Sequence, residues 1–236
     1  MADEIPDAPD GRNRMQEAMR ARQSSYDTRD HARMRMSGAT RAVITDLLST
    51  TADESVLGEA ADLVDRAVAL LAERPHGRLY EGRPEGSLGD QSRADLSPIV
   101  GAMNPVAPPM SLDLVDDRVI GTVVYGPQYE GPPGCVHGGI IAAGFDELLG
   151  FAQSLSGRPG MTGRLEISYR SPTPLLQELR YEGWMTDVDG RKIFTAATLC
   201  HGDTLCAEAT GLFISMKPNV MMRLLSSRIG GFDGEG

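Results

Sequence analysis

The sequence is poor in cysteine, histidine and aromatic residues. Its 236 residues include three cysteines, four histidines and one tryptophan. No two cysteines have the C-x-x-C spacing, so we expect no disulfide framework and a reducing, cytoplasmic location. The histidines lack the spacing of metal ligands, and no G-x-S-x-G segment occurs. We therefore expect neither a metal site nor a serine-hydrolase elbow.

Basic segments and long apolar runs are also missing. The formal charge is −10, and the acidic excess is shared between residues 1–100 and 101–236. Such a chain is not expected to bind nucleic acid, although a few local arginines could hold a small anion. The uncharged run 96–112 contains four prolines and is not a membrane span. The acidic first residues, MADEIPDAPDGR, do not resemble a secretory signal.

The N-terminal part reads as a tail followed by helices. Residues 1–12 are predicted to be disordered, and residues 13–36 to form one or two polar helices. Thr51-Ala-Asp-Glu54 is a candidate capping box, in which the threonine hydroxyl would start the next helix. Apolar residues then recur at helical spacing, and the helix is predicted to end near Pro75 and Gly77.

Residues 97–111 are predicted to form an extended, proline-rich linker. After it, two strand-like runs precede one helical segment, and four further strands follow. Asp-Gly and Gly-Asp turns indicate hairpins, because these residues tolerate positive φ. One helix among six mainly antiparallel strands predicts an α+β fold with the sheet wrapped around the helix. The predicted strands are 112–115, 119–125, 161–169, 179–188, 192–200 and 204–215.

The helical segment, CVHGGIIAAGFDELLGFA, carries an acidic pair within an otherwise apolar helix. From Ile140 to Leu155, apolar or small residues point in every direction except at Asp146 and Glu147. Burial raises the pKa of a carboxyl group and makes it a better general base. A salt bridge, or an exposed position at a dimer seam, is the more ordinary explanation of such a pair.

The start of this helix could hold an oxyanion. Free backbone N–H groups at a helix start carry partial positive charge, and Gly138 and Gly139 would let a substrate approach them closely. A tight loop-to-helix turn is the plainer interpretation. Gly138 and Asp146 are eight residues apart, about 12 Å along a helix. If both act on one carbonyl group, two antiparallel copies of the helix must share the site.

These motifs resemble a known family. Residues 101–217, about half of the chain, are similar to the PaaI-type hotdog-fold thioesterases of the 4HBT superfamily, especially the branch of human thioesterase superfamily members 4 and 5. The signature is HGG with an acid nine positions after the histidine, as His137 and Asp146 stand here. The segments YEGPPGCVHGG and MTGRLEISYRSPTPL are also similar. The first 96 residues are not explained, except that this branch also carries N-terminal extensions.

The resemblance implies a role for each site residue. Asp146 would be the general base or nucleophile, and the Gly138 N–H would hold the thioester oxygen with help from Gly139. His137 would orient the acyl carbonyl or stiffen the loop. Thr162, sixteen positions after Asp146, would position the attacking water, unless it is an ordinary strand-edge threonine. Glu147 is not assigned a catalytic role.

The expected substrate is an acyl-CoA, hydrolysed by a homodimer or higher homo-oligomer without metal or cofactor. Arg170 is the favoured contact for the CoA phosphates, and Phe145 and Met161 could line the acyl chain or belong to the core. The expected domains are an extension at 1–96, a hotdog domain at 97–218 and a tail at 219–236. The alternative is a catalytically weak acyl-CoA or lipid-binding module of the same fold. A hotdog-fold dehydratase would need an acid–histidine arrangement that the sequence lacks.

Overall fold

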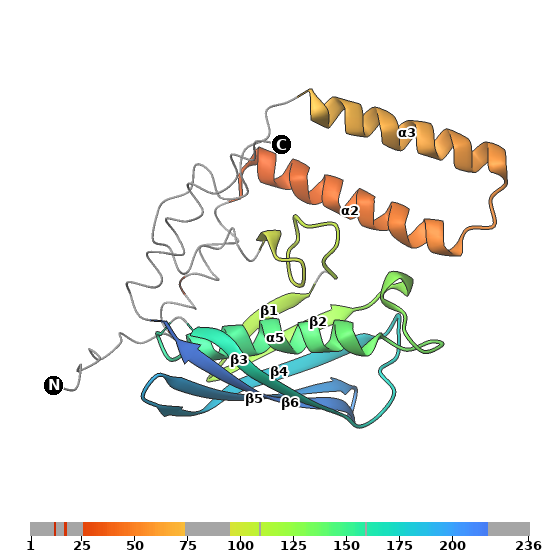
Figure 1. Cartoon of the computed structure of the whole chain (residues 1–236). Coiled ribbons are helices and arrows are strands. Elements are labelled where there is room, and N and C mark those ends of the chain that lie inside the picture. The colour runs from red at the N-terminus through yellow and green to blue at the C-terminus, as the bar shows by residue number, and fades with distance from the viewer. Residues whose placement is uncertain are drawn as a thin grey trace, which may run out of the picture.

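The computed structural model describes residues 26–73, 95–108, 110–158 and 160–216, together with Arg12 and Glu17. Within these residues a six-stranded antiparallel sheet curves around one long helix, and two further helices lie to one side (Figure 1). The strand order is β1-β2-β4-β5-β6-β3. The predicted α+β hotdog architecture and its helical extension are confirmed. The elements are α2 (Thr28–Ser49), α3 (Glu54–Ala72), β1 (Ser111–Val115), β2 (Arg118–Val124), η1 (Pro127–Tyr129), α5 (Gly138–Ser154), β3 (Gly160–Tyr169), β4 (Glu178–Asp189), β5 (Lys192–His201) and β6 (Thr204–Ser215).

The strands end at turns that the sequence predicted. Asp189 pairs with Lys192 across one turn, and His201 with Thr204 across the next. Gly190 and Gly202 in these turns have φ values of 57° and 53°, which a side chain with a Cβ rarely adopts. The short hairpins fix the register of β4, β5 and β6, and with it the face that each side chain occupies.

The core lies between α5 and the concave face of the sheet. Phe145, Leu148 and Leu149 are completely buried there. Gly183 on β4 makes room for the helix, because a Cβ at that position would lie 3.0 Å from Cδ2 of Leu148. The close approach of helix and sheet therefore depends on a missing side chain.

A pair of tyrosines crosses this core. The hydroxyl groups of Tyr125 and Tyr181 lie 3.0 Å apart and form a hydrogen bond. Burial raises the pKa of Tyr125 to about 12 and also raises the pKa of Tyr181. Gly144 of α5 faces the pair, since a Cβ there would lie 2.7 Å from the Tyr181 hydroxyl oxygen. The pair stays neutral and each hydroxyl has a partner, which limits the cost of burying them.

The predicted extended linker at 97–111 is wrong. The segment is a series of turns, in which Ser97 O accepts from Gly101 N–H at 3.0 Å and Asp95 O accepts from Met103 N–H at 2.9 Å. Val100 and Met110 are buried and join the core. The prolines prevent regular structure here, but the apolar residues between them still fold against α5.

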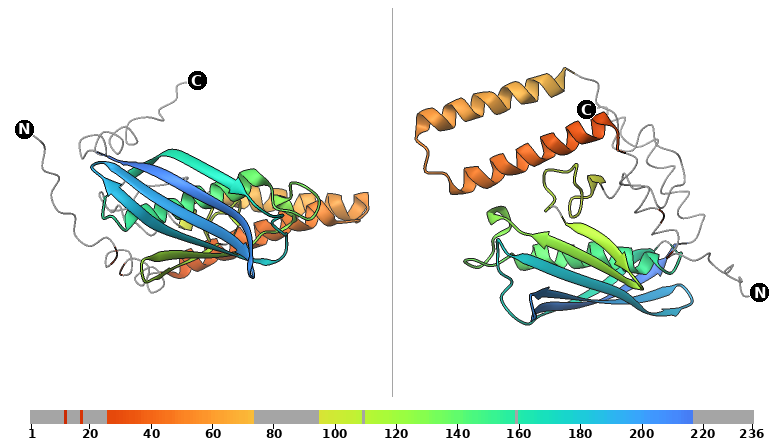
Figure 2. Two further views of the ribbon diagram at one scale, coloured as in Figure 1. Left: turned by 90° about the horizontal axis from the view of Figure 1, so that it is seen from below. Right: turned by 180° about the vertical axis from the view of Figure 1, so that it is seen from behind.

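The helix α2 is attached to this segment. Arg41 Nη2 donates to Ala102 O at 2.9 Å, and Thr45 Oγ1 donates to Gln128 Oε1 at 3.1 Å. The helix α3 lies farther from the sheet than α2 (Figure 2). None of its residues is buried. None of the helices in the described residues combines the length and the apolar character needed to cross a bilayer.

Two predictions for the extension need correction. Asp53, not Thr51, is the N-cap of α3, and its Oδ1 accepts from Val56 N–H at 3.1 Å. A carboxylate one residue before the helix reaches the free amides directly, so the threonine is not needed. The helix α2 also continues well beyond residue 36, where the prediction ended. The predicted tails, most of residues 13–25, and Pro75 and Gly77 lie outside the described residues.

Candidate active site

The start of α5 is fixed by the side chain of His137. His137 is the N-cap, and its Nδ1 accepts a hydrogen bond from Gly139 N–H at 3.0 Å. A ring nitrogen that accepts carries no proton, so in the neutral ring the proton is on Nε2. The N–H of Gly139 is thus already in use, whereas no group in the described part of the chain accepts from the N–H of Gly138. The oxyanion donor that this helix start offers is Gly138.

Tyr169, at the end of β3, covers the same helix start. Its hydroxyl donates to Gly138 O at 2.7 Å. A Cβ on Gly138 would lie 3.3 Å from the Tyr169 hydroxyl oxygen, so the ring rests against the glycine. In the sequence, Tyr169 is only the last residue of a predicted strand. Its contact with Gly138 depends on how β3 passes α5, which no local pattern encodes.

Asp146 and Thr162 are in direct contact. Thr162 Oγ1 donates to Asp146 Oδ1 at 2.8 Å. Both residues are exposed in the protomer, so the carboxylate is not desolvated by its own chain. The register of β3 against β6 shifts between Thr162 and Arg164, which marks a bulge beside the acid. Bulges re-aim side chains, and this one lies where the hydroxyl turns toward α5.

Glu147 lies in a different environment from its neighbour. Its Oε1 accepts from Ser97 Oγ at 2.9 Å, on the side of α5 that the segment 95–108 covers. Burial raises the pKa of this carboxyl group, and the charge of Asp146 raises it further. Ser97 Oγ in turn accepts from Ile99 N–H at 3.1 Å. Glu147 thus holds the turn segment in place, whereas Asp146 faces solvent.

The expected acyl-contact residues differ in exposure. Phe145 is completely buried and packs edge-on against Tyr181, with ring centroids 5.1 Å apart. That position is a core position within the protomer. Met161 on β3 is 57% exposed and lies next to Thr162. Of the two, Met161 is the one that a ligand at the exposed edge could touch.

The arginine expected to contact phosphate is already paired. Arg170 Nε donates to Glu208 Oε1 at 3.0 Å, and its Nη2 also contacts that oxygen. Arg164 lies 3.6 Å from the carboxylate of Glu166.

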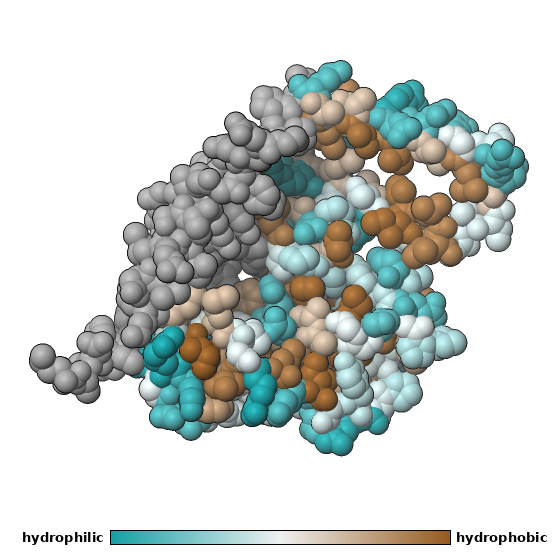
Figure 3. Space-filling view, in the orientation of Figure 1, coloured by the Kyte–Doolittle hydropathy of each residue, from teal (hydrophilic) through white to brown (hydrophobic). Residues whose placement is uncertain are grey.

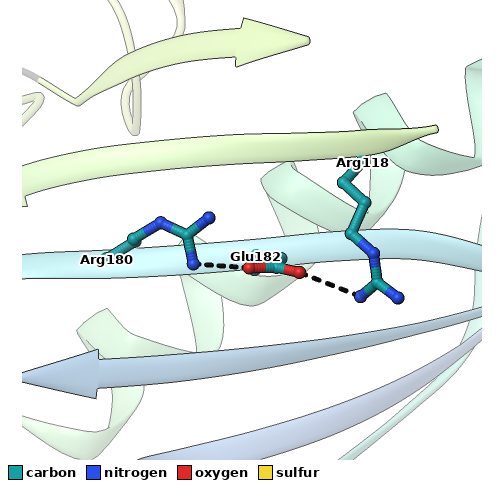
Figure 4. A network of polar contacts seen from close by, with 3 residues as sticks. All are labelled: Arg118, Arg180 and Glu182. Carbon is teal, nitrogen blue, oxygen red and sulfur yellow. Dashed lines mark hydrogen bonds and ion pairs between the residues drawn. The ribbon is translucent and has the colours of Figure 1, made fainter. Parts of the chain in front are cut away.

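A second arginine cluster lies on the outer face of the sheet, away from α5. Glu182 accepts from Arg118 Nη1 at 2.9 Å and from Arg180 (Figure 4). The Arg118 guanidinium also lies 4.3 Å from the ring centroid of Trp184.

The exposed face near Asp146 continues along the sheet edge. Strand β3 is an edge strand that pairs only with β6, and most of its residues are exposed. On α5 the exposed residues are Gly139, Asp146 and Ser154. An edge strand with unpaired backbone groups beside an exposed helix face is suited to association with another chain.

Comparison with known proteins agrees with this architecture. Residues 133–208 match the family model of the thioesterase superfamily. A crystal structure of a thioesterase superfamily protein is 34% identical, with a TM-score of 0.65 over 77% of this chain and 94% of that one. The chain therefore belongs to the thioesterase superfamily.

Two curated relatives carry a more specific name. Acyl-coenzyme A thioesterase THEM4 of Mus musculus is 36% identical over 111 residues, which are 46% of this chain and 48% of that protein. The Xenopus laevis protein of the same name is 37% identical over 111 residues, or 46% and 50% of the two chains. The chain spans about half the length of these relatives.

Proposed function

We propose that this protein hydrolyses acyl-CoA thioesters to the free acid and CoA. The observation that carries the proposal is the hydrogen bond from Thr162 to Asp146 on an exposed face, together with the free N–H of Gly138. Thioester hydrolysis needs a base, a water molecule and an oxyanion donor, and these groups supply the first and the last. The acyl-coenzyme A thioesterase relatives share this half of the chain.

The active unit is proposed to be a homodimer. Gly138 and Asp146 lie on the same helix, eight residues apart, which places them about 12 Å from each other along the axis. Two antiparallel copies of α5 would bring Gly138 of one copy opposite Asp146 of the other, and would form two equal sites. The exposure of β3 and of Asp146 supports such an association.

In the proposed hydrolysis, each of the site residues has a defined role. Asp146 removes a proton from the water that Thr162 helps to hold, and the water oxygen attacks the thioester carbon. The Gly138 N–H stabilises the oxyanion, the C–S bond breaks, and the CoA sulfur leaves with a proton. Asp146 could instead attack the carbon directly, with water hydrolysing the resulting anhydride. Since its Nδ1 is occupied, His137 presents Nε2–H as a further donor to the carbonyl oxygen.

Release of free thiol from a panel of acyl-CoAs tests the proposal. Asp146→Asn should lower turnover by about a hundredfold or more, as for loss of a general base. Asp113→Asn is a matched control, since Asp113 is an exposed aspartate on β1. Equal rates in wild type and Asp146→Asn would remove Asp146 from the mechanism. Tight acyl-CoA binding without turnover in the wild type would favour the alternative, a binding module.

A cytoplasmic location, which three free thiols suit, also stays a proposal.

A further inference from the structure

The helix α3 carries a long apolar stripe that nothing in the described chain buries. No residue of α3 is buried, and its seven large apolar side chains are between 40% and 66% exposed. An amphipathic helix gains most of its stability from burying its apolar face. The stripe consists of Val56, Leu57, Leu63, Val64, Val68, Leu70 and Leu71.

The helix α2 presents a second stripe of the same kind. Met36, Val43 and Leu47 are exposed and lie seven and four residues apart, on one side of the helix. Ser37 is buried on another side, and Arg41 beside it bonds to the segment 95–108. Figure 3 shows an opening between the two helices, bordered by hydrophobic side chains of both.

The segment Thr50–Asp53 joins the two helices. Thr50 and Asp53 are both extended, with ψ values of 144° and 173°. The helices α2 and α3 are not packed on each other in the structure. In this conformation α3 does not reach the stripe on α2 of its own chain.

Charge favours α2 as the surface that α3 binds. The helix α2 has more bases than acids, and α3 has more acids than bases. Opposite charges beside two apolar stripes select that pairing over self-association of like helices. The charged residues of α2 are Arg29, Asp30, Arg33, Arg35, Arg41 and Asp46, and those of α3 are Glu54, Glu59, Asp62, Asp65 and Arg66.

The same charges disfavour a lipid surface as the occupant. Helices that lie on membranes carry lysine and arginine on their polar face, because the inner leaflet is anionic. The polar face of α3 is acidic instead. A second copy of this chain supplies both an apolar and a basic surface.

We propose that two copies of this protein exchange their α3 helices. The apolar stripe of each α3 packs on the exposed stripe of α2 in the other copy, with the segment Thr50–Asp53 as the hinge. The contact is two-fold symmetric and uses an element that each chain already has, as in domain swapping. This proposal does not depend on the catalytic one.

Cross-linking between copies tests it in the full-length protein. One tagged copy carries Ala39→Cys on α2, and a differently tagged copy carries Val64→Cys on α3. Both residues are exposed. Cys135→Ser and Cys200→Ser remove the two partly exposed native thiols. After mixing, a short bis-maleimide should join the two tags. Adding Leu57→Glu to the second copy should lower the yield about tenfold or more, because it would bury an unpaired charge.

The control is Ala69→Glu, which adds the same charge to the polar side of α3 and should leave the yield unchanged. Cross-linking only within one chain, seen in the Ala39→Cys/Val64→Cys double variant, would show that α3 folds back on its own α2 and would overturn the proposal. So would a yield that Leu57→Glu does not lower, or the absence of any cross-link. Binding to anionic vesicles that competes with the cross-link would identify a membrane as the occupant instead.

Discussion

The hydroxyl of Tyr169 donates to the carbonyl oxygen of Gly138 at 2.7 Å and ties the end of β3 to the first residue of α5. The hydrogen bond holds the peptide group that follows the proposed oxyanion donor. The contact thus makes Tyr169 a positioning residue for Gly138. Its effect would reach the substrate only through the direction in which the Gly138 N–H points.

Tyr169→Phe therefore should reduce turnover without weakening substrate binding. Loss of one neutral hydrogen bond costs about 0.5–1.5 kcal/mol, or about a twofold to tenfold lower kcat. The measurement is the split between kcat and KM in the thiol-release assay. Tyr169→Phe keeps the ring, so Tyr169→Ala, which removes the ring, should lower kcat further. An unchanged kcat in Tyr169→Phe would leave the tyrosine with a packing role only.

Two substitutions of Gly138 separate its N–H from its small size. Gly138→Pro removes the N–H, and proline is well tolerated at the first position of a helix. His137, before it, already has the extended ψ of 133° that a residue preceding proline prefers. We expect a loss of about a hundredfold to a thousandfold in kcat, as for removal of one oxyanion donor. Gly138→Ala keeps the N–H and should lose much less, although its Cβ presses on Tyr169 at 3.3 Å.

Gly138→Pro also allows a test of the shared site. In a mixed dimer of Gly138→Pro and Asp146→Asn chains, one of the two sites has both groups intact. Random mixing should restore about a quarter of the wild-type activity if the sites lie across a two-fold axis. Activity that stays at the level of the separate variants would mean that each chain acts alone.

The hydroxyl of Thr162 can be tested by two substitutions of similar size. Thr162→Val removes the donor to Asp146, and a hydrogen bond to a charged group contributes about 1.5–3 kcal/mol, so activity should fall about tenfold to a hundredfold. Thr162→Ser keeps the hydroxyl group and should keep most of the wild-type activity. Equal activity in the valine and serine variants would assign Thr162 an ordinary strand-edge role.

The buried carboxyl group of Glu147 should make the stability of the protein depend on pH. Burial raises its pKa in the folded protein above the value in the unfolded chain. The stability that Glu147 contributes is therefore fully present below the pKa of this group in the unfolded chain. It is lost as the pH rises through the pKa of the group in the folded protein. Glu147→Gln keeps the acceptor for Ser97 but does not titrate. Urea denaturation between about pH 4 and pH 8 should show wild type losing stability relative to Glu147→Gln as pH rises. Glu178→Gln, an exposed control that keeps Glu147, should follow the wild type.

A single methyl group added at Gly183, under the helix α5, should destabilise the protein. A Cβ there would lie 3.0 Å from Leu148, so Gly183→Ala should lower the free energy of unfolding by about 1–3 kcal/mol. Gly58→Ala is the matched control, because nothing lies within 4 Å of a Cβ at that position on α3. It should raise helix stability by about 0.5–1 kcal/mol. Chemical denaturation of the two variants compares them directly, and equal stability would contradict the tight packing of α5.

The strands and α5 could be predicted because their signals are local. Alternating apolar residues and glycine turns placed the ends of every strand within about one residue. The roles expected of Asp146 and Thr162 came from the family resemblance, and the hydrogen bond between them was not predicted. The turn segment before β1 could not be predicted, since its proline content resembles that of a linker and its burial depends on α5. The roles of Glu147 and Tyr169 also depend on distant partners, which single-sequence patterns do not encode.

The bond between Ser97 and Glu147 affects where the chain can be cut. The expected border between extension and catalytic part falls at residue 96, one residue before a hydroxyl that supports the neighbour of the proposed general base. A shortened protein that begins after Ser97 would lack the hydroxyl group that donates to the half-buried carboxyl group of Glu147, next to Asp146. Trimming at this point would therefore remove a hydrogen bond of the thioesterase body together with the helices α2 and α3, so a loss of activity would have two explanations.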